Sequence, residues 1–304
     1  MRTRIAALAL IVALASGCWD DLSVPLRLLA PAATDKGQVQ VQFDQFYAER
    51  GGQKLYFDLY RPASASGPTP LVIMVHGGFW RYGTRTDLTE FSYDLAANGY
   101  TAAAIDYRLA DGSTAFPSPV SDVLAAVRYF HDNAEQVGID PQRMALFGRS
   151  AGAHLALLAG MTNDASIFDG ERAAGELPGI KAIVDVSGPA DLTADPATAV
   201  DWQIATVETF LGKKLTEAGP LLATASPATY ARASGPPILI IHGDADTIVP
   251  VDQARRLVAA LDAAGQQNSY LEIPGMDHII SSLWISGFAQ QYRQAILDFL
   301  GSNF

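Results

Sequence analysis

The pattern in this chain with the clearest chemical meaning is a serine between two glycines, in the stretch GRSAGAHLA at residues 148–156. Ser150 has Gly148 two residues before it and Gly152 two residues after it. The preceding MALF predicts a buried strand and the following residues predict a helix, so the serine falls on a strand-to-helix corner. The glycines allow this corner to be tight enough to project the hydroxyl. This pattern favours a nucleophile, although small residues at a corner also serve close helix–strand packing.

A serine hydroxyl is a poor nucleophile near neutral pH and needs a base within hydrogen-bonding distance. Five histidines are candidates for that base. His131 lies in a predicted helix and is expected at the surface, while His76 and His242 end predicted strands, where their rings would brace loops. His154 is four residues after the serine on the same helix and points elsewhere. His278 follows the last predicted strand on a loop that can place it over the serine, so we expect His278 to be the base.

Three aspartates near the same predicted edge are candidates for the acid that orients this histidine. Asp244 and Asp246 follow the apolar strand PPILII, and Asp277 adjoins His278. Adjacent side chains in an extended loop usually diverge, which argues against Asp277. The residue pattern leaves Asp244 and Asp246 as alternatives.

A fourth stretch, His76-Gly-Gly-Phe-Trp80, closes the strand LVIMV. Glycines after a strand leave backbone N–H groups free to point into a pocket. Together with the N–H of Ala151, these groups could bind a developing oxyanion. Phe79 and Trp80 would also form a hydrophobic wall, and the two roles are compatible.

These motifs need elements that bring them to one edge of a sheet. Residues 39–46 and 53–62 alternate apolar and polar residues around a glycine turn, which predicts an antiparallel pair. Apolar runs predict six further strands, at 70–78, 101–108, 143–148, 180–188, 236–244 and 269–274. Helices are predicted between them, at 87–97, 119–137, 150–161, 251–264 and 288–300. This alternation predicts an α/β fold, a mostly parallel eight-stranded sheet with helices on both faces and reactive side chains at its carboxyl edge.

The length of 304 residues and 49% hydrophobic content suit one large α/β domain or two modest ones. Residues 192–235 do not fit the alternation and predict an irregular, partly helical insertion, a small cap. The formal net charge of −11 argues against nucleic acid as a partner, because nothing in the chain would neutralise a row of phosphates.

The N-terminus has two arginines, an apolar run and then small residues ending at Cys18, the single cysteine. This layout predicts a signal peptide over residues 1–17, and residues 14–18 resemble a bacterial lipobox. A lone cysteine in an exported protein forms no internal disulfide. Lipidation therefore explains the presence of Cys18 better than an incidental cysteine does. We therefore expect a cell-envelope lipoprotein, the alternative being a periplasmic or secreted protein. Residues 18–38 would be a tether and residues 39–304 the domain.

Over residues 39–304 the sequence resembles an α/β-hydrolase of the bacterial carboxylesterase branch, similar to hormone-sensitive-lipase-like and feruloyl-esterase-like proteins. Further likenesses lie in DYRLA (106–110), SGPADL (187–192) and ASPATY (225–230). The chain order of Ser150, Asp246 and His278 is the order this family uses. Similarity to the pattern H-G-x-x-D-x-x-V-P selects Asp246 over Asp244.

Position by position, the resemblance also implies that the oxyanion donors are the amides of Gly78, Phe79 and Ala151. Many relatives carry HGGG, whereas this chain has HGGFW, a form that also resembles kynurenine formamidase.

The sequence therefore predicts a serine hydrolase that cleaves carboxylic esters, acting on a small-molecule ester without a metal or an organic cofactor. Three alternatives remain: an amide hydrolase of the same fold (a formamidase or exopeptidase), a feruloyl or acetyl carbohydrate-ester deacylase, and a catalytically silent binding module. Arg149 is either a surface charge or a contact for an acidic substrate. The oligomeric state is left open, and membrane contact is expected only through the lipid anchor.

Overall fold

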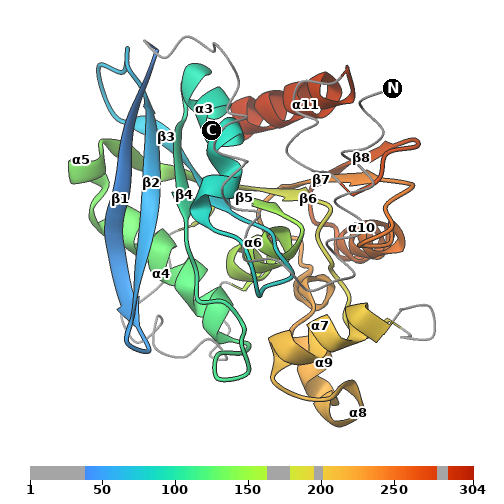
Figure 1. Cartoon of the computed structure of the whole chain (residues 1–304). Coiled ribbons are helices and arrows are strands. Elements are labelled where there is room, and N and C mark those ends of the chain that lie inside the picture. The colour runs from blue at the N-terminus through green and yellow to red at the C-terminus, as the bar shows by residue number, and fades with distance from the viewer. Residues whose placement is uncertain (1–37, 163–178, 195–200, 279–286) are drawn as a thin grey trace, which may run out of the picture. The chain divides into compact units, whose positions relative to one another are not determined.

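The structure, a computed structural model, describes residues 38–162, 179–194, 201–278 and 287–304. The predicted signal peptide, Cys18 and nearly all of the predicted tether lie outside these residues. The described strands form one eight-stranded sheet in the order β1-β2-β4-β3-β5-β6-β7-β8 (Figure 1). The strands are β1 Val39–Arg50, β2 Gln53–Pro62, β3 Thr69–Val75, β4 Thr101–Ile105, β5 Ile139–Arg149, β6 Ala182–Val186, β7 Ile238–Gly243 and β8 Asn268–Ile273. All eight predicted strands are therefore present.

The sheet is antiparallel at one edge and parallel elsewhere. β1 pairs with β2, and β2 with β4, in antiparallel fashion, while β4, β3, β5, β6, β7 and β8 pair in parallel. Gly51 and Gly52 both have positive φ angles, as the predicted tight turn between β1 and β2 requires. The expected mostly parallel α/β sheet is confirmed.

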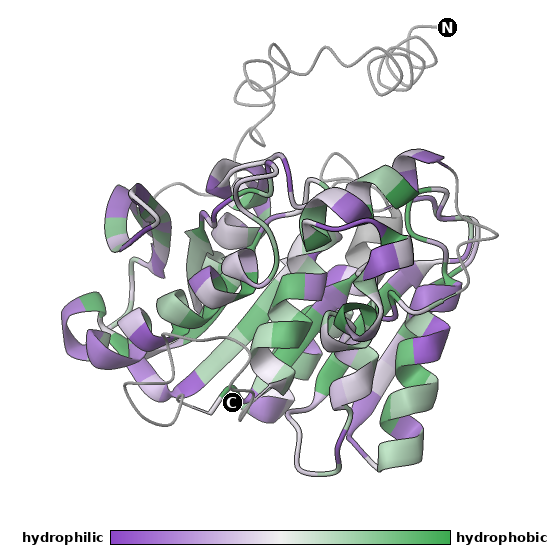
Figure 2. Ribbon diagram, turned by 90° about the horizontal axis from the view of Figure 1, so that it is seen from below, coloured by the Kyte–Doolittle hydropathy of each residue, from purple (hydrophilic) through white to green (hydrophobic). Residues whose placement is uncertain are grey.

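Helices cover both faces of the sheet. One hydrophobic core packs α4 (Ser118–Asp132), α6 (Ala151–Met161) and α10 (Asp252–Ala264) against one face. A second core packs α3 (Thr89–Ala97) and α11 (Gly287–Asn303) against the other. Successive residues of β3 alternate between the two cores, as strand geometry requires. Figure 2 shows the apolar strands in the middle of the sheet and polar residues along the outer sides of the helices.

Several boundaries differ from the sequence prediction; β5, for example, begins four residues earlier than expected and β4 ends three residues earlier. The single helix expected over 119–137 is divided into α4 and α5 (Ala134–Val137), because the side-chain amide of Asn133 donates to the carbonyl of Tyr129 at 2.8 Å and caps α4. β3 stops at Val75 instead of including the glycines that follow it. His76-Gly-Gly-Phe-Trp80 therefore lies in a loop, which runs to a short 3-10 helix, η2 (Arg85–Leu88), before α3.

The described part of the predicted insertion is more helical than expected. It contains α7 (Asp201–Leu211), α8 (Leu215–Ala218), α9 (Pro220–Thr224) and the 3-10 helix η5 (Pro227–Tyr230). Phe210 and Leu211, at the end of α7, are buried in the same core as α4 and α6. Part of this segment is thus integral to the domain.

None of the helices in the described ranges is both long and apolar enough to cross a membrane.

Candidate active site

Ser150 lies at the sharp corner between β5 and α6. Its backbone angles are φ 55° and ψ −125°, outside the regions that a residue with a side chain normally adopts, so the corner is strained. The N–H of Ser150 donates a hydrogen bond to the carbonyl of Val186 in β6 at 2.8 Å, which holds the strained residue against the neighbouring strand. Ser150 is nearly buried, and what remains exposed faces a cavity.

The two glycines beside the serine are required by close packing. A Cβ on Gly148 would overlap the backbone of Gly152 and Ala153 in α6, and a Cβ on Gly152 would overlap the carbonyl groups of Val75 and His76. The corner can therefore form only if both positions lack a side chain. This confirms the tight strand-to-helix turn predicted from the sequence.

Asp246 and His278 are brought together by the loops that follow β7 and β8. The Nδ1 atom of His278 lies 2.7 Å from Oδ2 of Asp246, and the carboxylate is buried. The backbone N–H groups of Ile248 and Val249 donate to Oδ1 of Asp246, each at 2.8 Å. The carboxylate is therefore fixed through both oxygens and can orient the imidazole.

The two other aspartates do not contact the His278 ring. Oδ1 of Asp244 accepts a hydrogen bond from the N–H of Gly275, and Oδ1 of Asp277 accepts from the N–H and hydroxyl of Thr247. Both carboxylates brace the loops that carry the Asp246–His278 pair. Of the three candidates in the sequence, the geometry singles out Asp246.

The pKa of Asp246 lies well below its usual range. Burial opposes ionisation of this carboxylate, but hydrogen bonds from His242 and His278 outweigh the burial. Nε2 of His242 lies 3.2 Å from Oδ2 of Asp246 and 2.8 Å from the carbonyl of Val249. His242 therefore helps to hold the Asp246 carboxylate in its ionised form. Sequence reasoning assigned His242 a loop-bracing role and missed this contact with the acid.

Ser150 and His278 are not joined by a hydrogen bond in this structure. The Nδ1 atom of His278 is engaged by Asp246, which leaves Nε2 for proton transfer. Such contacts are often long in structures without substrate and tighten when substrate binds. Residues 279–286, which follow His278, lie outside the described residues.

The remaining histidines lie where the sequence predicted. The side chain of His131 is 38% exposed and lies beside Asp132. His76 is buried and stacks on the ring of Tyr107, which braces the loop after β3. His154 is also buried and points away from the serine hydroxyl, toward the carbonyl of Ala225.

The loop after β3 approaches Ser150 in an unusual conformation. Gly78, Phe79 and Trp80 have consecutive φ angles of 115°, 58° and 60°. Positive φ in two bulky residues in succession is strained, at roughly 1–3 kcal/mol each, and persists only if surrounding contacts hold it. Among the described residues, none accepts a hydrogen bond from the N–H of Gly78, Phe79 or Ala151. These three amides are therefore available to an oxyanion.

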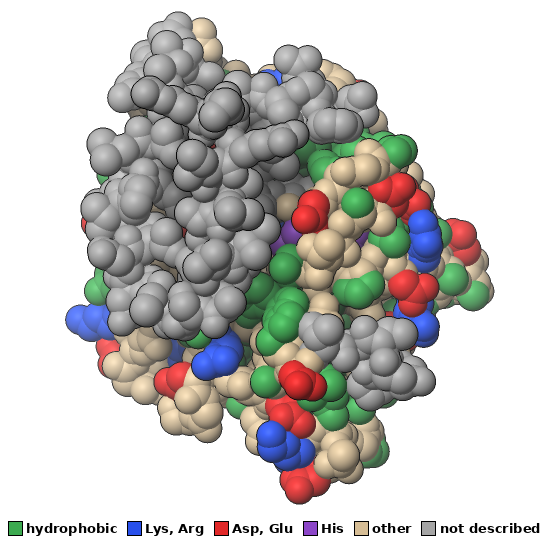
Figure 3. Space-filling model, turned by 45° about the vertical axis from the view of Figure 1, so that its right-hand side comes forward, with side chains coloured by type: hydrophobic (Ala, Val, Ile, Leu, Met, Phe, Trp, Pro, Cys, Tyr) green, Lys and Arg blue, Asp and Glu red, His purple; other side chains and the backbone are tan. Residues whose placement is uncertain are grey.

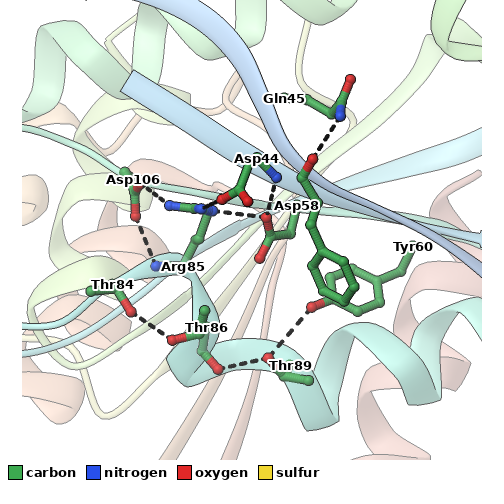
Figure 4. A network of polar contacts seen from close by, with 10 residues as sticks. Asp44, Gln45, Asp58, Tyr60, Thr84, Arg85, Thr86, Thr89 and Asp106 are labelled. Atoms are coloured by element: carbon green, nitrogen blue, oxygen red, sulfur yellow. Dashed lines mark hydrogen bonds and ion pairs between the residues drawn. The ribbon is translucent and has the colours of Figure 1, made fainter. Parts of the chain in front are cut away.

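An ion-pair network that sequence reasoning missed anchors this loop to the antiparallel edge of the sheet (Figure 4). The guanidinium of Arg85 contacts Asp44 in β1, Asp58 in β2 at 2.8 Å and Asp106 after β4. The backbone N–H of Arg85 also donates to Asp106 at 2.9 Å. The sequence signal for this network was weak, because Arg85 and its partners are spread over more than sixty positions.

A cavity of about 170 Å³ opens beside Ser150. Its wall is mostly apolar and includes Phe79, Trp80, Leu192, Trp202, Ile204, Val207, Leu215, Ile248 and Val249. On the molecular face shown in Figure 3, histidine side chains emerge beside a group of hydrophobic side chains. The predicted insertion supplies a large part of this wall through α7 and α8.

The polar side chains of the wall are held by protein groups. Oε1 of Gln253 accepts from the N–H groups of Ala190 and Asp191, and Nε2 of Gln203 donates to the carbonyl of Ile248. Ser150 lines the same wall. The cavity is thus suited to an apolar group, not one that requires several hydrogen bonds.

The structure places Arg149 outside the wall of the cavity. It is therefore not placed to contact a substrate there. Its Nη1 atom is buried without a hydrogen-bond partner among the described residues, and burial lowers the pKa of its guanidinium. Arg149 as a whole is half-buried, so part of the side chain still reaches the surface.

Within the described ranges, no group of three or more His, Cys, Asp or Glu side chains is arranged to hold a metal ion.

Comparison with known proteins identifies the family to which the chain belongs. The family model BD-FAE matches residues 57–261. The chain is 33% identical to esterase LipC of Mycobacterium tuberculosis over 69% of this chain and 53% of the relative. It is 31% identical to esterase LipQ of the same organism over 83% of this chain and 60% of the relative. The chain thus spans just over half the length of these curated relatives.

Among solved structures, a truncated carbohydrate esterase from gut microbiota superposes with a TM-score of 0.78 at 24% identity. The superposition covers 90% of this chain and 99% of that one. The likeness supports the eight-stranded architecture with helices on both faces. The BD-FAE match covers more than half of the chain and includes the β5–α6 corner and Asp246. The protein therefore belongs to the BD-FAE family of α/β-hydrolases.

Proposed function

We propose that this protein is a carboxylesterase in which Ser150 is the nucleophile, His278 the general base and Asp246 the acid that orients it. The observation that carries the proposal is the 2.7 Å contact between Asp246 and His278 at the edge of the sheet where the strained Ser150 corner also lies. Relatives named as esterases support the same activity.

The reaction follows from the atoms that these residues present. Nε2 of His278 takes the proton of Ser150 while Oγ attacks the ester carbonyl, and the buried Asp246 carboxylate stabilises the imidazolium that forms. The imidazolium then protonates the departing alcohol, which leaves an acyl group on Ser150. Water, deprotonated by the same imidazole, attacks this acyl-enzyme. The imidazolium then returns the proton to Oγ of Ser150 as the bond to the acyl group breaks and the carboxylic acid leaves.

The developing negative charge on the carbonyl oxygen requires donors that are already in place. The amides of Gly78, Phe79 and Ala151 supply them, because the loop after β3 and the start of α6 are both fixed before substrate binds. Loss of one such donor typically costs on the order of 10²–10³ in turnover.

A substitution at the serine tests the proposal directly. Wild type should hydrolyse p-nitrophenyl acetate and be labelled by a fluorophosphonate, and Ser150→Ala should lose both properties. Ser113→Ala, at an exposed serine that does not line the cavity, should retain both. An inactive and unlabelled wild type would contradict the proposal and favour a binding module.

The size and apolar wall of the cavity favour substrates with a small apolar group next to the ester bond. Its volume of about 170 Å³ is close to the roughly 150 Å³ that accepts benzene in an apolar cavity. We therefore expect the best substrates to carry an apolar group of up to about six carbons beside the scissile bond.

A series of p-nitrophenyl esters of increasing acyl length tests this expectation. We expect kcat/KM to peak at an intermediate chain and to fall for long chains, because the cavity, whose wall includes Trp202 and Leu215, has a limited volume. Trp202→Ala should move the optimum toward longer acyl groups. An optimum that is unchanged in this variant would show that another wall limits the substrate.

A carbohydrate ester remains a second candidate, since the superposed gut-microbiota protein is named a carbohydrate esterase. The apolar cavity favours an arrangement in which the acyl group enters it and the sugar stays outside. Acetylated and feruloylated sugars in the same panel, together with N-formylkynurenine and an aminoacyl anilide, distinguish the ester substrates from the amide alternatives.

We also propose that Cys18 is lipidated after removal of residues 1–17 and that residues 18–38 tether the domain to the cell envelope. The support is the signal-like N-terminus and the single cysteine. In a bacterial host that processes lipoproteins, the full chain should partition into detergent. Detergent partitioning that survives Cys18→Ala would contradict the anchor.

A further inference from the structure

His154 is a buried histidine that the proposed reaction does not use. It lies on α6, four residues after Ser150, and both of its ring nitrogens have partners. The indole N–H of Trp80 lies 3.2 Å from Nδ1, and Nε2 lies 2.8 Å from the carbonyl of Ala225. An indole N–H can only donate and a carbonyl can only accept. The two partners therefore fix one neutral tautomer, with the proton on Nε2.

The surroundings of His154 keep that tautomer neutral. Its side chain is fully buried, and this burial lowers its pKa to about 4, although the contact with Ala225 opposes the change. The ring also meets Phe210 edge-on, at a centroid distance of 5.2 Å. Over the usual pH range of esterase assays, Nδ1 thus remains an acceptor for Trp80.

Trp80 is the last of three consecutive residues with positive φ in the loop after β3. Its carbonyl accepts a hydrogen bond from the N–H of Ala110 at 2.8 Å. Its ring stacks on Phe210 at 4.5 Å and meets His154 edge-on at 5.1 Å. The polar contact of the Trp80 side chain with α6 is the hydrogen bond to His154. That bond therefore links the strained loop to the helix that begins beside the serine.

We propose that His154 is a positioning residue for the oxyanion hole. Through Trp80, it holds the amides of Gly78 and Phe79 in register with Ser150, and it does not itself touch the substrate. The inference rests on the proposed esterase function. A shift of about 1 Å in such donors is enough to lower turnover on the order of 10²-fold.

The variant His154→Phe keeps an aromatic ring and removes both hydrogen bonds. With p-nitrophenyl acetate, whose acyl group is too small to depend on the cavity wall, we expect kcat to fall about 10- to 100-fold while KM changes less than about threefold. The affinity for a boronic acid that mimics the tetrahedral intermediate should fall in parallel with kcat/KM. His154→Gln, whose amide can both accept and donate, should recover part of the loss.

Leu158→Ala is the matched control, because Leu158 is buried on the same helix one turn further from the loop. It should lower the melting temperature but leave kcat and boronic acid affinity near the wild-type values. If His154→Phe folds and behaves like Leu158→Ala, the proposal is overturned, because His154 then has only a packing role.

Trp80→Phe tests the same bond from its other end, even if His154→Phe does not fold. It should lower kcat for the acetate ester and weaken boronic acid binding, and unchanged values would overturn the proposal. ¹⁵N NMR of the wild type should show His154 as the neutral Nε2–H tautomer at pH 7, and the Nδ1–H form would also overturn it. If the wild type hydrolyses no ester, the proposed function itself fails. An active wild type with unaffected variants instead overturns only the role of His154.

Discussion

Asp246 shows how one residue can be both buried and charged. Four groups surround its carboxylate: two backbone N–H groups at Oδ1, and the rings of His242 and His278 at Oδ2. Such contacts favour the ionised form strongly enough to overcome the cost of burial, which is why the pKa falls although the side chain is hidden from water. A charged, immobile acceptor is what a base needs in order to keep one ring orientation.

Replacement of this acceptor should therefore affect catalysis more than folding. Asp246→Asn presents an amide to Nδ1 of His278 and favours the wrong tautomer, so we expect kcat to fall by up to about 10⁴-fold. Steady-state kinetics on a nitrophenyl ester measures the change. Asp244→Asn is the matched control, because the Asp244 carboxylate contacts the backbone of Gly275 and not the imidazole. Retention of more than about a tenth of kcat in Asp246→Asn would remove Asp246 from its proposed role.

The pKa of Asp185, in β6, shifts in the opposite direction to that of Asp246. Its Oδ1 accepts from the N–H of Gly188, but its Oδ2 is buried without a hydrogen-bond partner among the described residues. Burial raises the pKa of Asp185 to about 7, and the positive charge of His242 opposes this shift only in part. In the unfolded chain the same group has a pKa near 3.9.

This difference predicts how stability depends on pH. Between about pH 4 and pH 7 the folded protein retains a proton that the unfolded chain has lost, so the contribution of Asp185 to stability falls as pH rises. The slope is at most about 1.4 kcal/mol per pH unit. Asp185→Asn does not titrate, so its free energy of unfolding relative to wild type should rise by about 2 kcal/mol or more from pH 4.5 to pH 8. Urea unfolding at both pH values measures this, and an equal difference at each would contradict the assignment.

At the scale of elements, the loop after β3 is held from two sides. Trp80 fixes it to α6, and Arg85 fixes it to β1, β2 and the end of β4. Burial opposes the charge of Arg85, but its hydrogen bond with Asp58 and the neighbouring carboxylates raise the pKa of the guanidinium above its ordinary value. The strained backbone at positions 78–80 ends at the first of these anchors, and the second follows five positions later.

Removal of the second anchor should destabilise the protein and disturb the loop. Arg85→Met leaves Asp58, which is 1% exposed, without its cationic partner. We expect a loss of roughly 3 kcal/mol in the free energy of unfolding, together with lower kcat. Arg256→Met is the control, because its partners Asp252 and Asp191 form an exposed pairing worth at most about 1 kcal/mol. Equal losses in urea unfolding for the two variants would show that the network adds nothing beyond a surface ion pair.

The sequence predicted the strands better than the contacts between loops. Continuous apolar runs such as PLVIMV locate strands that are buried on both faces, because side chains on both sides of such a strand lie in the hydrophobic core. The corner at Ser150 was predictable because its glycines indicate a tight local turn. His278 and the aspartates were candidates because they follow strands, and the family resemblance was needed to choose Asp246 over Asp244. The Arg85 network and the Trp80–His154 bond join residues 21 to 74 positions apart, and no periodic pattern in the sequence indicates such contacts.

At the scale of the molecule, the fold and the candidate site belong to one part of the chain. The buried residues described in the two hydrophobic cores lie between Tyr47 and Leu300, and the family match lies within that interval. Residues 1–35 separate from residues 36–304 as a distinct unit. Attachment and catalysis should therefore be separable, since the proposed lipid anchor at Cys18 belongs to the first unit and the proposed triad to the second.

A protein that begins at Lys36 tests this separation. Its melting temperature should agree with that of the full chain within about 2 °C, because removal of the first unit takes nothing from the described cores. Its kcat on a water-soluble nitrophenyl ester should also be unchanged, while it should no longer partition into detergent. Cys18→Ala in the full chain is the control that removes only the proposed lipid. A melting temperature several degrees lower in the shortened protein would show that the N-terminal segment packs on the domain and is more than a tether.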